Sequence, residues 1–165
     1  MEKSRLHQLS SPAKWALTAY LLLTTLGFSV AALMSHLHYG WSHQQTKLYY
    51  LGSETEMAFP KLYAELLQTA HVHSFTMPMV FFILWWSLTY LPLKSGFKKF
   101  FIVGGALSIL VYNAAPFMLR FVSPKWVLLF SVGGIGLFVF FLSPTILVLY
   151  DTWFGMSGKI PSQKG

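Results

Sequence analysis

Residues 60–91 read PKLYAELLQTAHVHSFTMPMVFFILWWSLTYL, a polar beginning that leads into a long apolar run. Two histidines, His71 and His73, lie where the polar residues give way to the apolar ones, and Pro78 follows closely. Ionisable side chains inside a membrane segment are rare and mark functional positions. The pattern predicts a membrane-spanning helix that starts at Pro60 and carries a ligand-binding site near its first half.

The composition indicates an integral membrane protein. Of the 165 residues, 55% are hydrophobic and 10% are charged, whereas soluble domains carry about 25% charged residues. The net charge of +7 comes from basic residues in short segments between apolar runs, so it reports membrane topology and no nucleic acid partner is expected. The chain has no cysteine, which excludes disulfides, iron–sulfur clusters, zinc–thiolate sites and covalently attached haem c.

Four apolar stretches are each long enough to cross a lipid bilayer, which takes roughly 20 helical residues. They predict an all-α fold: an integral membrane four-helix antiparallel bundle in one transmembrane domain covering residues 1–165. The predicted spans are about 15–37, 66–91, 100–119 and 126–150, with an outer loop at 38–65.

The ends of these helices carry recognisable signals. Serine followed by proline, at 11–12 and 123–124, is typical of an N-cap and the first helical position. Gly40 is expected to cap the first span at its C-terminus. Ser53 and Glu56 have the spacing of a capping box, which predicts that a short interfacial helix starts there.

The basic residues predict the orientation. An even number of spans puts both termini on one side, and that side holds eight lysines and arginines against four on the other. Since basic residues concentrate on the cytoplasmic side, both termini are predicted to be cytoplasmic and the protein to be a multi-pass protein of the bacterial inner membrane. The other side holds Lys47, Lys61, Arg120 and Lys125.

A second histidine pair, His36 and His38, ends the first span, and both pairs fall at the outer end of the bundle. Antiparallel helices joined by one loop usually pack together, so the two pairs are expected to face each other. Within each pair the side chains point roughly 200° apart around a helix, so at most one member of each pair can face the bundle interior unless the helix end is frayed. Periodicity leaves open which member of each pair that is.

The first functional hypothesis is one b-type haem between a histidine of span one and a histidine of span two. Haem iron accepts paired axial imidazoles, and we take His71 with His36 as the first pair and His73 with His38 as alternates. Aromatic side chains of span two are expected to cover the macrocycle: Phe75, Phe81 and Phe82. The inner half has no histidine, so electrons are expected to pass to a quinol, a periplasmic cytochrome or other membrane subunits rather than across the bilayer.

Two alternatives stay open. Imidazole with thioether suits copper, so a copper or other metal site of a delivery or assembly factor is the second hypothesis. Its ligands come from His36, His38, His71 and His73, with Met34 or Met77 as the thioether. The third is a metal-free structural subunit of a larger complex or a homo-oligomer, packed through glycines of the last span. These glycines are Gly133, Gly134 and Gly136.

Two prolines remove backbone hydrogen bonds from the predicted helices near the histidines, and this supports a ligand site there. Pro78 frees the carbonyl of Ser74, and Pro116 frees that of Tyr112 beside Asn113. Membranes tolerate unpaired backbone groups where a cavity or a ligand is present.

The sequence contains no serine elbow, no HExxH helix and no charged residue in the middle of a span. The residues that a hydrolase or a transmembrane ion relay needs are therefore absent. Whether the chain is an enzyme stays open, and the pattern favours a redox subunit over a catalyst acting alone.

Three segments of the first half resemble a known group of proteins: residues 35–40 (SHLHYG), 51–54 (LGSE) and 65–75 (ELLQTAHVHSF). Together they resemble small bacterial inner-membrane proteins, and the chain is similar to four-helix membrane cytochromes b. The resemblance implies haem held between histidines of facing helices. The chain departs from the di-haem pattern because it lacks histidines in the inner half.

Overall fold

The protein is described by a computed structural model over residues 6–40 and 42–156, and those residues are almost entirely helical. Four helices have the length and apolarity needed to cross a membrane, the fourth being the continuous unit Pro124–Phe154. In chain order the elements are η1 (Leu6–Gln8), α1 (Ser11–Tyr39), α2 (His43–Leu51), α3 (Tyr63–Thr89), α4 (Ser95–Phe121), η2 (Pro124–Val127) and α5 (Leu128–Phe154).

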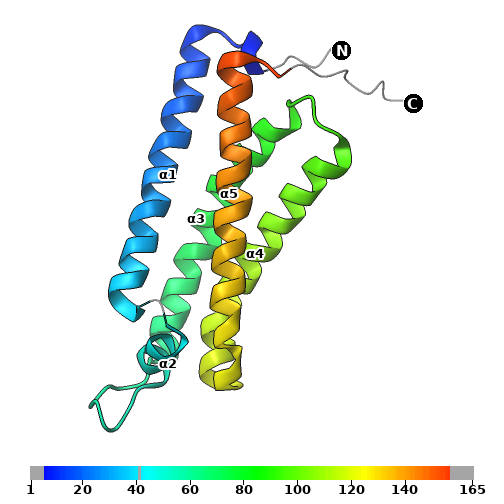
Figure 1. Ribbon diagram of the computed structural model, residues 1–165. Helices are drawn as coiled ribbons and strands as arrows, with labels where there is room; N and C mark the ends of the chain where they lie inside the picture. Colours follow the sequence, from blue (N-terminus) through cyan, green and yellow to red (C-terminus); the bar gives the residue numbers. More distant parts are fainter. Residues whose placement is uncertain (1–5, 41, 157–165) are drawn as a thin grey trace.

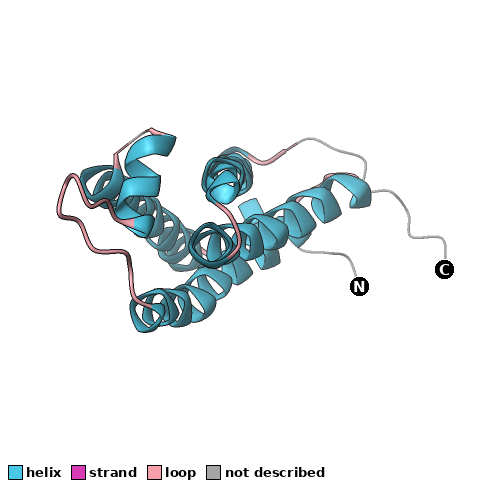
Figure 2. Cartoon of the chain, turned by 90° about the horizontal axis from the view of Figure 1, so that it is seen from below, coloured by secondary structure: helices cyan, strands magenta, loops and turns pink. Residues whose placement is uncertain are grey.

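The four long helices alternate in direction, so the fold is the expected all-α four-helix antiparallel bundle (Figure 1). The start of α1 and the end of α5 lie at one end, here called the termini end. The short helix α2 and the loop after it lie at the opposite end, here called the α2 end. Figure 2 looks along the bundle from below, with α2 lying across that end. There α2 packs on α1, α4 and η2.

The closest helix pair is α4 with α5, and glycines of α5 permit this approach. A Cβ atom on Gly133 would lie 2.9 Å from the backbone of Tyr112, and one on Gly136 would collide with the Ser108 side chain. Small residues let membrane helices come close, as the sequence predicted for this part of the chain. Gly134 plays no such part, because its Cβ would meet only the Tyr112 ring at 3.9 Å.

Aromatic rings from three helices fill the middle of the bundle. The Phe28 ring of α1 stacks on that of Phe141 of α5 at 4.3 Å and meets the Phe81 ring of α3 at 6.0 Å. The hydroxyl of Tyr20 donates to the carbonyl of Val80 at 3.2 Å and so ties α1 to α3. Most other large apolar side chains are exposed, as is expected of helices in contact with lipid.

The interfacial helix begins at His43, ten residues before the predicted start. A complete capping box explains this start, because the Ser42 hydroxyl accepts from Gln45 N at 3.1 Å and the Gln45 Oε1 accepts from Ser42 N at 3.3 Å. The prediction of a helix at Ser53 was wrong, since Ser53 instead forms paired backbone hydrogen bonds with Ala58, both 2.9 Å long. Capping-box spacing alone therefore did not identify the right serine.

The start of α3 also differs from the prediction. The helix begins at Tyr63 rather than at Pro60, because the Glu65 carboxylate accepts from the backbone N–H of Leu62 at 2.8 Å and fixes the first turn. Three residues of the expected helix are extended chain instead.

The remaining helix ends follow the sequence signals closely. Gly40 ends α1 as expected, with φ of 66° and its N–H donating to His36 O at 2.8 Å. Ser123 caps η2 through its side chain. At α1 the N-cap is Ser10, one residue before the expected serine.

Candidate functional site

The two histidines of α3 face different surroundings. His73 is half-buried and its ring lies 6.3 Å from the Tyr112 ring of α4. His71 is exposed and packs edge-on against Phe75 at 5.1 Å. Met77, one turn after His73, is half-buried on the same side. The face of α3 that points into the bundle is therefore the one with His73 and Met77.

The histidines of α1 divide in the same way. His36 is half-buried, whereas His38 is exposed. The Nδ1 of His38 lies 2.8 Å from the carbonyl oxygen of Met34, and its ring lies 6.4 Å from that of Tyr49 in α2. One member of each pair is thus half-buried and the other exposed, which is consistent with the angular spacing.

A tyrosine pair connects the two histidine-bearing helices to α4. The hydroxyls of Tyr39 and Tyr112 lie 3.3 Å apart, and Tyr39 follows His36 by less than one turn of α1. Because His73 contacts the same Tyr112 ring, this end of α1 and the first half of α3 both reach one residue of α4. The expected direct packing of α1 on α3 is weak here, since α1 has its closer backbone neighbours in α2 and α5.

Around this pair lies an aromatic cluster that the sequence analysis missed, formed by Tyr39, Tyr49, Tyr50, Tyr112 and Phe130. Tyr50 is its most buried tyrosine, and its ring lies 4.9 Å from that of Tyr49 and 5.0 Å from that of Phe130. Burial raises the pKa of Tyr50, and the neighbouring tyrosines add to the shift. The sequence signal for this cluster is the adjacent pair Tyr49 and Tyr50, which lies in the predicted outer loop.

Hydrogen bonds hold α2 and its loop against the bundle. The Nε2 of His43 lies 2.8 Å from Ser131 Oγ of α5. The backbone N–H of Lys61 donates to Tyr50 O at 3.1 Å, and the Nε of Arg120 donates to Lys61 O at 3.3 Å. The cluster is consequently covered on the side that faces away from the middle of the bundle.

A buried amide lies beside Met77. The Nδ2 of Asn113 donates to Ile109 O at 2.9 Å and lies 3.8 Å from Met77 Sδ. Its Oδ1 is buried and has no hydrogen-bond partner among residues 6–40 and 42–156. Pro78 and Pro116 lie inside α3 and α4, as predicted, and both helices continue past them. This part of the bundle therefore combines two prolines within helices and a buried side-chain acceptor that has no partner in the described chain.

The aromatic cover expected from span two is not formed. Phe75 and Phe82 point outward, with 62% and 59% of their surface exposed. Phe81 is fully buried, but it belongs to the central core with Phe28 and Phe141. The ring that contacts the half-buried His73 belongs instead to Tyr112 of α4, a different helix, so a periodicity analysis of α3 alone does not find it.

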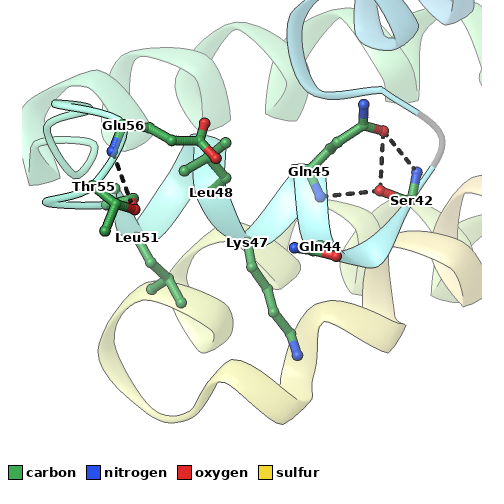
Figure 3. A pocket seen from close by; sticks show the side chains of 10 residues that line it. Ser42, Gln44, Gln45, Lys47, Leu48, Leu51, Thr55 and Glu56 are labelled. Atoms are coloured by element: carbon green, nitrogen blue, oxygen red, sulfur yellow. Dashed lines mark hydrogen bonds between the residues drawn. The ribbon is translucent and has the colours of Figure 1, made fainter.

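A polar groove of about 600 Å³ lies beside α2 (Figure 3). None of the histidines lines it. Its walls are α2 and the loop that follows, where Ser53 Oγ lies 2.8 Å from Thr55 Oγ1 and accepts from Glu56 N at 3.4 Å. The groove and the histidine site are thus separate features of the same end.

Within the described part of the chain no group of three or more histidine, aspartate or glutamate side chains is placed to hold a metal ion. A haem with two axial imidazoles needs two such side chains only, so this finding concerns other metal sites.

Four apolar helices of sufficient length define this chain as a multi-pass membrane protein. The sequence model of the transmembrane helical domain family Aq_1264_TM matches residues 40–159, and the chain belongs to this family. His71, His73 and Met77 lie within the matched segment, whereas His36 and His38 precede it. Neither a curated protein nor a solved structure matches the chain.

Proposed function

We propose that this membrane protein is an electron-transfer or accessory subunit that holds one haem b between His36 of α1 and His73 of α3. The observation that carries the proposal is that Tyr112 of α4 is contacted both by the half-buried histidine of α3 and by a tyrosine that follows the half-buried histidine of α1. His73 contacts Tyr112 directly, and Tyr39, within a turn of His36, contacts it from the other helix. We therefore replace His71 by His73 in the favoured pair and keep His38 and His71 as alternates.

Histidine side chains are chemically suitable ligands for haem b. Neutral imidazoles are the usual axial ligands of b-type haem, and a chain without cysteine matches a haem held without covalent attachment. A ligating histidine normally donates its second ring N–H to an oxygen acceptor. The unpaired Asn113 Oδ1, beside Met77 on the side of α3 that also carries His73, is such an acceptor.

In this proposal each residue has a simple task. His36 and His73 bind the iron, and the Tyr39–Tyr112 pair holds their helices in register. The helix α2 keeps water from the site through Thr46 and the buried Tyr50. When bound, haem b supplies one-electron exchange at its iron.

The distribution of basic residues supports placing the α2 end on the periplasmic side of a bacterial inner membrane, with cytoplasmic termini. A single haem at that end exchanges electrons with a quinol in the outer leaflet, with a periplasmic cytochrome or with other membrane subunits.

One observation favours copper as a second candidate. His73 and Met77 face the bundle one turn apart, and imidazole with thioether is a donor set suited to Cu(I). With His36 as a third donor the protein would serve in metal delivery or assembly.

A visible spectrum of the protein purified in mild detergent, oxidised and dithionite-reduced, tests the proposal together with metal analysis of the same sample. We expect a sharp reduced α band, a Soret shift and about one iron per chain. A colourless protein with about one copper per chain would replace haem by the copper site. A colourless, metal-free protein, isolated with its native partners, would overturn both and leave a structural subunit.

A further inference from the structure

The loop between α2 and α3 holds two large apolar side chains away from the bundle. Met57 has 87% of its surface exposed, and Phe59 has 92%. Figure 1 shows this loop projecting beyond the turn between α4 and α5 at the α2 end. Exposed apolar side chains on the long helices face lipid, but the loop lies past the ends of those helices. Its two apolar side chains therefore mark a surface for a contact outside the bilayer.

Hydrogen bonds within the loop fix the direction of these side chains. Besides the pairing of Ser53 with Ala58, the Met57 N–H donates to Glu54 O at 3.3 Å. Met57 has φ of 47°, a left-handed conformation that residues with a side chain rarely adopt. Such a conformation costs free energy, and it is found at functional positions where the surrounding contacts hold it in place. Because the loop is already ordered, a partner that binds it loses less free energy to ordering.

The charge of the loop is opposite to that of the chain as a whole. Residues 52–60 read GSETEMAFP and carry Glu54 and Glu56 with no basic residue, in a chain of net charge +7. Both carboxylates are exposed. The next basic side chain, Lys61, lies 3.4 Å from the Glu65 carboxylate. An apolar surface flanked by glutamates repels anionic lipid headgroups and attracts lysine and arginine of another protein.

The groove beside α2 adjoins this loop. Thr55 and Glu56 form its wall on the loop side, and Leu48 and Leu51 of α2 also line it. Lys47 lines the groove as well, but Figure 3 shows its side chain pointing away from Glu56. A segment of a partner can therefore lie in the groove while the exposed apolar side chains of the loop contact the same partner.

We propose that Glu54, Glu56, Met57 and Phe59 form a docking surface for a water-soluble protein domain on the α2 side of the membrane. That domain presents an apolar pocket rimmed by lysine and arginine. Met57 and Phe59 enter the pocket, and the two glutamates pair with its basic rim. Apolar anchors inside a polar rim are the usual anatomy of a protein interface. The surface contains none of the histidines, so the proposal does not depend on a bound cofactor.

Photo-crosslinking of the full chain in the cells that make it tests the proposal. A benzophenone-bearing amino acid at position 59 replaces one aromatic side chain by another. Position 79 is the matched control, because Met79 is 70% exposed but lies within α3. We expect position 59, and not position 79, to become joined to one soluble protein, at a peptide that contains apolar residues together with lysine or arginine. In isolated membranes, salt at about 0.5 M should lower the yield several-fold.

Reversing the loop charges provides the second measurement. We expect the double variant E54K and E56K to lower the yield at position 59 by about tenfold at equal amounts of membrane protein. K99E reverses an exposed charge at the termini end and should leave the yield unchanged. If the double variant does not accumulate, the salt dependence of the unaltered loop decides. A product formed with lipid or with a second copy of this chain, a yield that does not respond to charge, or no product at all would overturn the proposal.

Discussion

The hydroxyl oxygens of Tyr39 and Tyr112 lie 3.3 Å apart, which joins the last turn of α1 to the middle of α4 across 73 residues of sequence. The Tyr112 ring also lies 6.3 Å from that of His73 in α3. Three helices therefore meet at one side chain. The placement of the histidines depends on a residue of α4 as much as on the helices that carry them.

Removing either hydroxyl of this pair should have the same effect, because the two share one hydrogen bond. We expect Y39F and Y112F each to lower the free energy of unfolding by about 1 kcal/mol, and the double variant to lose no more than either single one. Thermal unfolding in detergent measures this, with Y63F as the control because Tyr63 is largely exposed. Losses that add in the double variant would mean that the hydroxyls act separately.

Single histidine substitutions should separate the half-buried from the exposed positions. If haem is bound, we expect H36A and H73A to abolish the reduced α band, whereas H38A and H71A should keep it. The reason is that only the first two are half-buried, whereas His38 and His71 are exposed. Visible spectra of equal amounts of membrane-inserted protein provide the comparison. A band lost in H71A but kept in H73A would assign the ligand to the outward face of α3.

The sequence was sufficient for features that depend on composition and local order. Four uncharged runs predicted the four-helix bundle, and Gly40 and Ser123 marked helix ends, because apolarity and capping act within a few residues. Features that depend on contacts between distant residues were beyond it. The start of α2 was missed for a different reason: Ser42 with Gln45 has the same capping-box spacing as the chosen Ser53 with Glu56, and it is the first pair that forms the box.

At the candidate site too, the sequence predicted the local features but not the contacts between distant residues. The sequence placed both histidine pairs and Met77 at one end, but helical periodicity could not choose the inward face, because both faces of α3 are apolar. The tyrosine cluster was missed since its members come from α1, α2 and α4, and only the folded chain brings them together.

The two adjacent glycines of α5 should respond differently to a methyl group. We expect G133A to destabilise the bundle by about 1–3 kcal/mol, because its Cβ would lie 2.9 Å from the Tyr112 backbone, which cannot move aside easily. G134A should change stability by less than about 0.5 kcal/mol, since its Cβ meets only a ring atom at 3.9 Å. Unfolding in detergent, followed by tryptophan fluorescence, compares the two variants. Equal losses would show that the α4–α5 contact is looser than the structure indicates.

Tyr50 should make the stability of the α2 end sensitive to alkaline pH. Burial raises its pKa above the ordinary 10.0, and the nearby Tyr39 and Tyr112 act in the same direction. The folded protein therefore holds the phenolic proton more tightly than the unfolded chain does. This contribution to stability is complete below about pH 10 and falls as the pH rises further, by about 1.4 kcal/mol per pH unit. Since Y50F has no proton to lose at this position, its stability should fall less steeply than that of the wild type between pH 10 and 11. Parallel curves for the two proteins would show that Tyr50 reaches water in the folded state and ionises there as freely as in the unfolded chain.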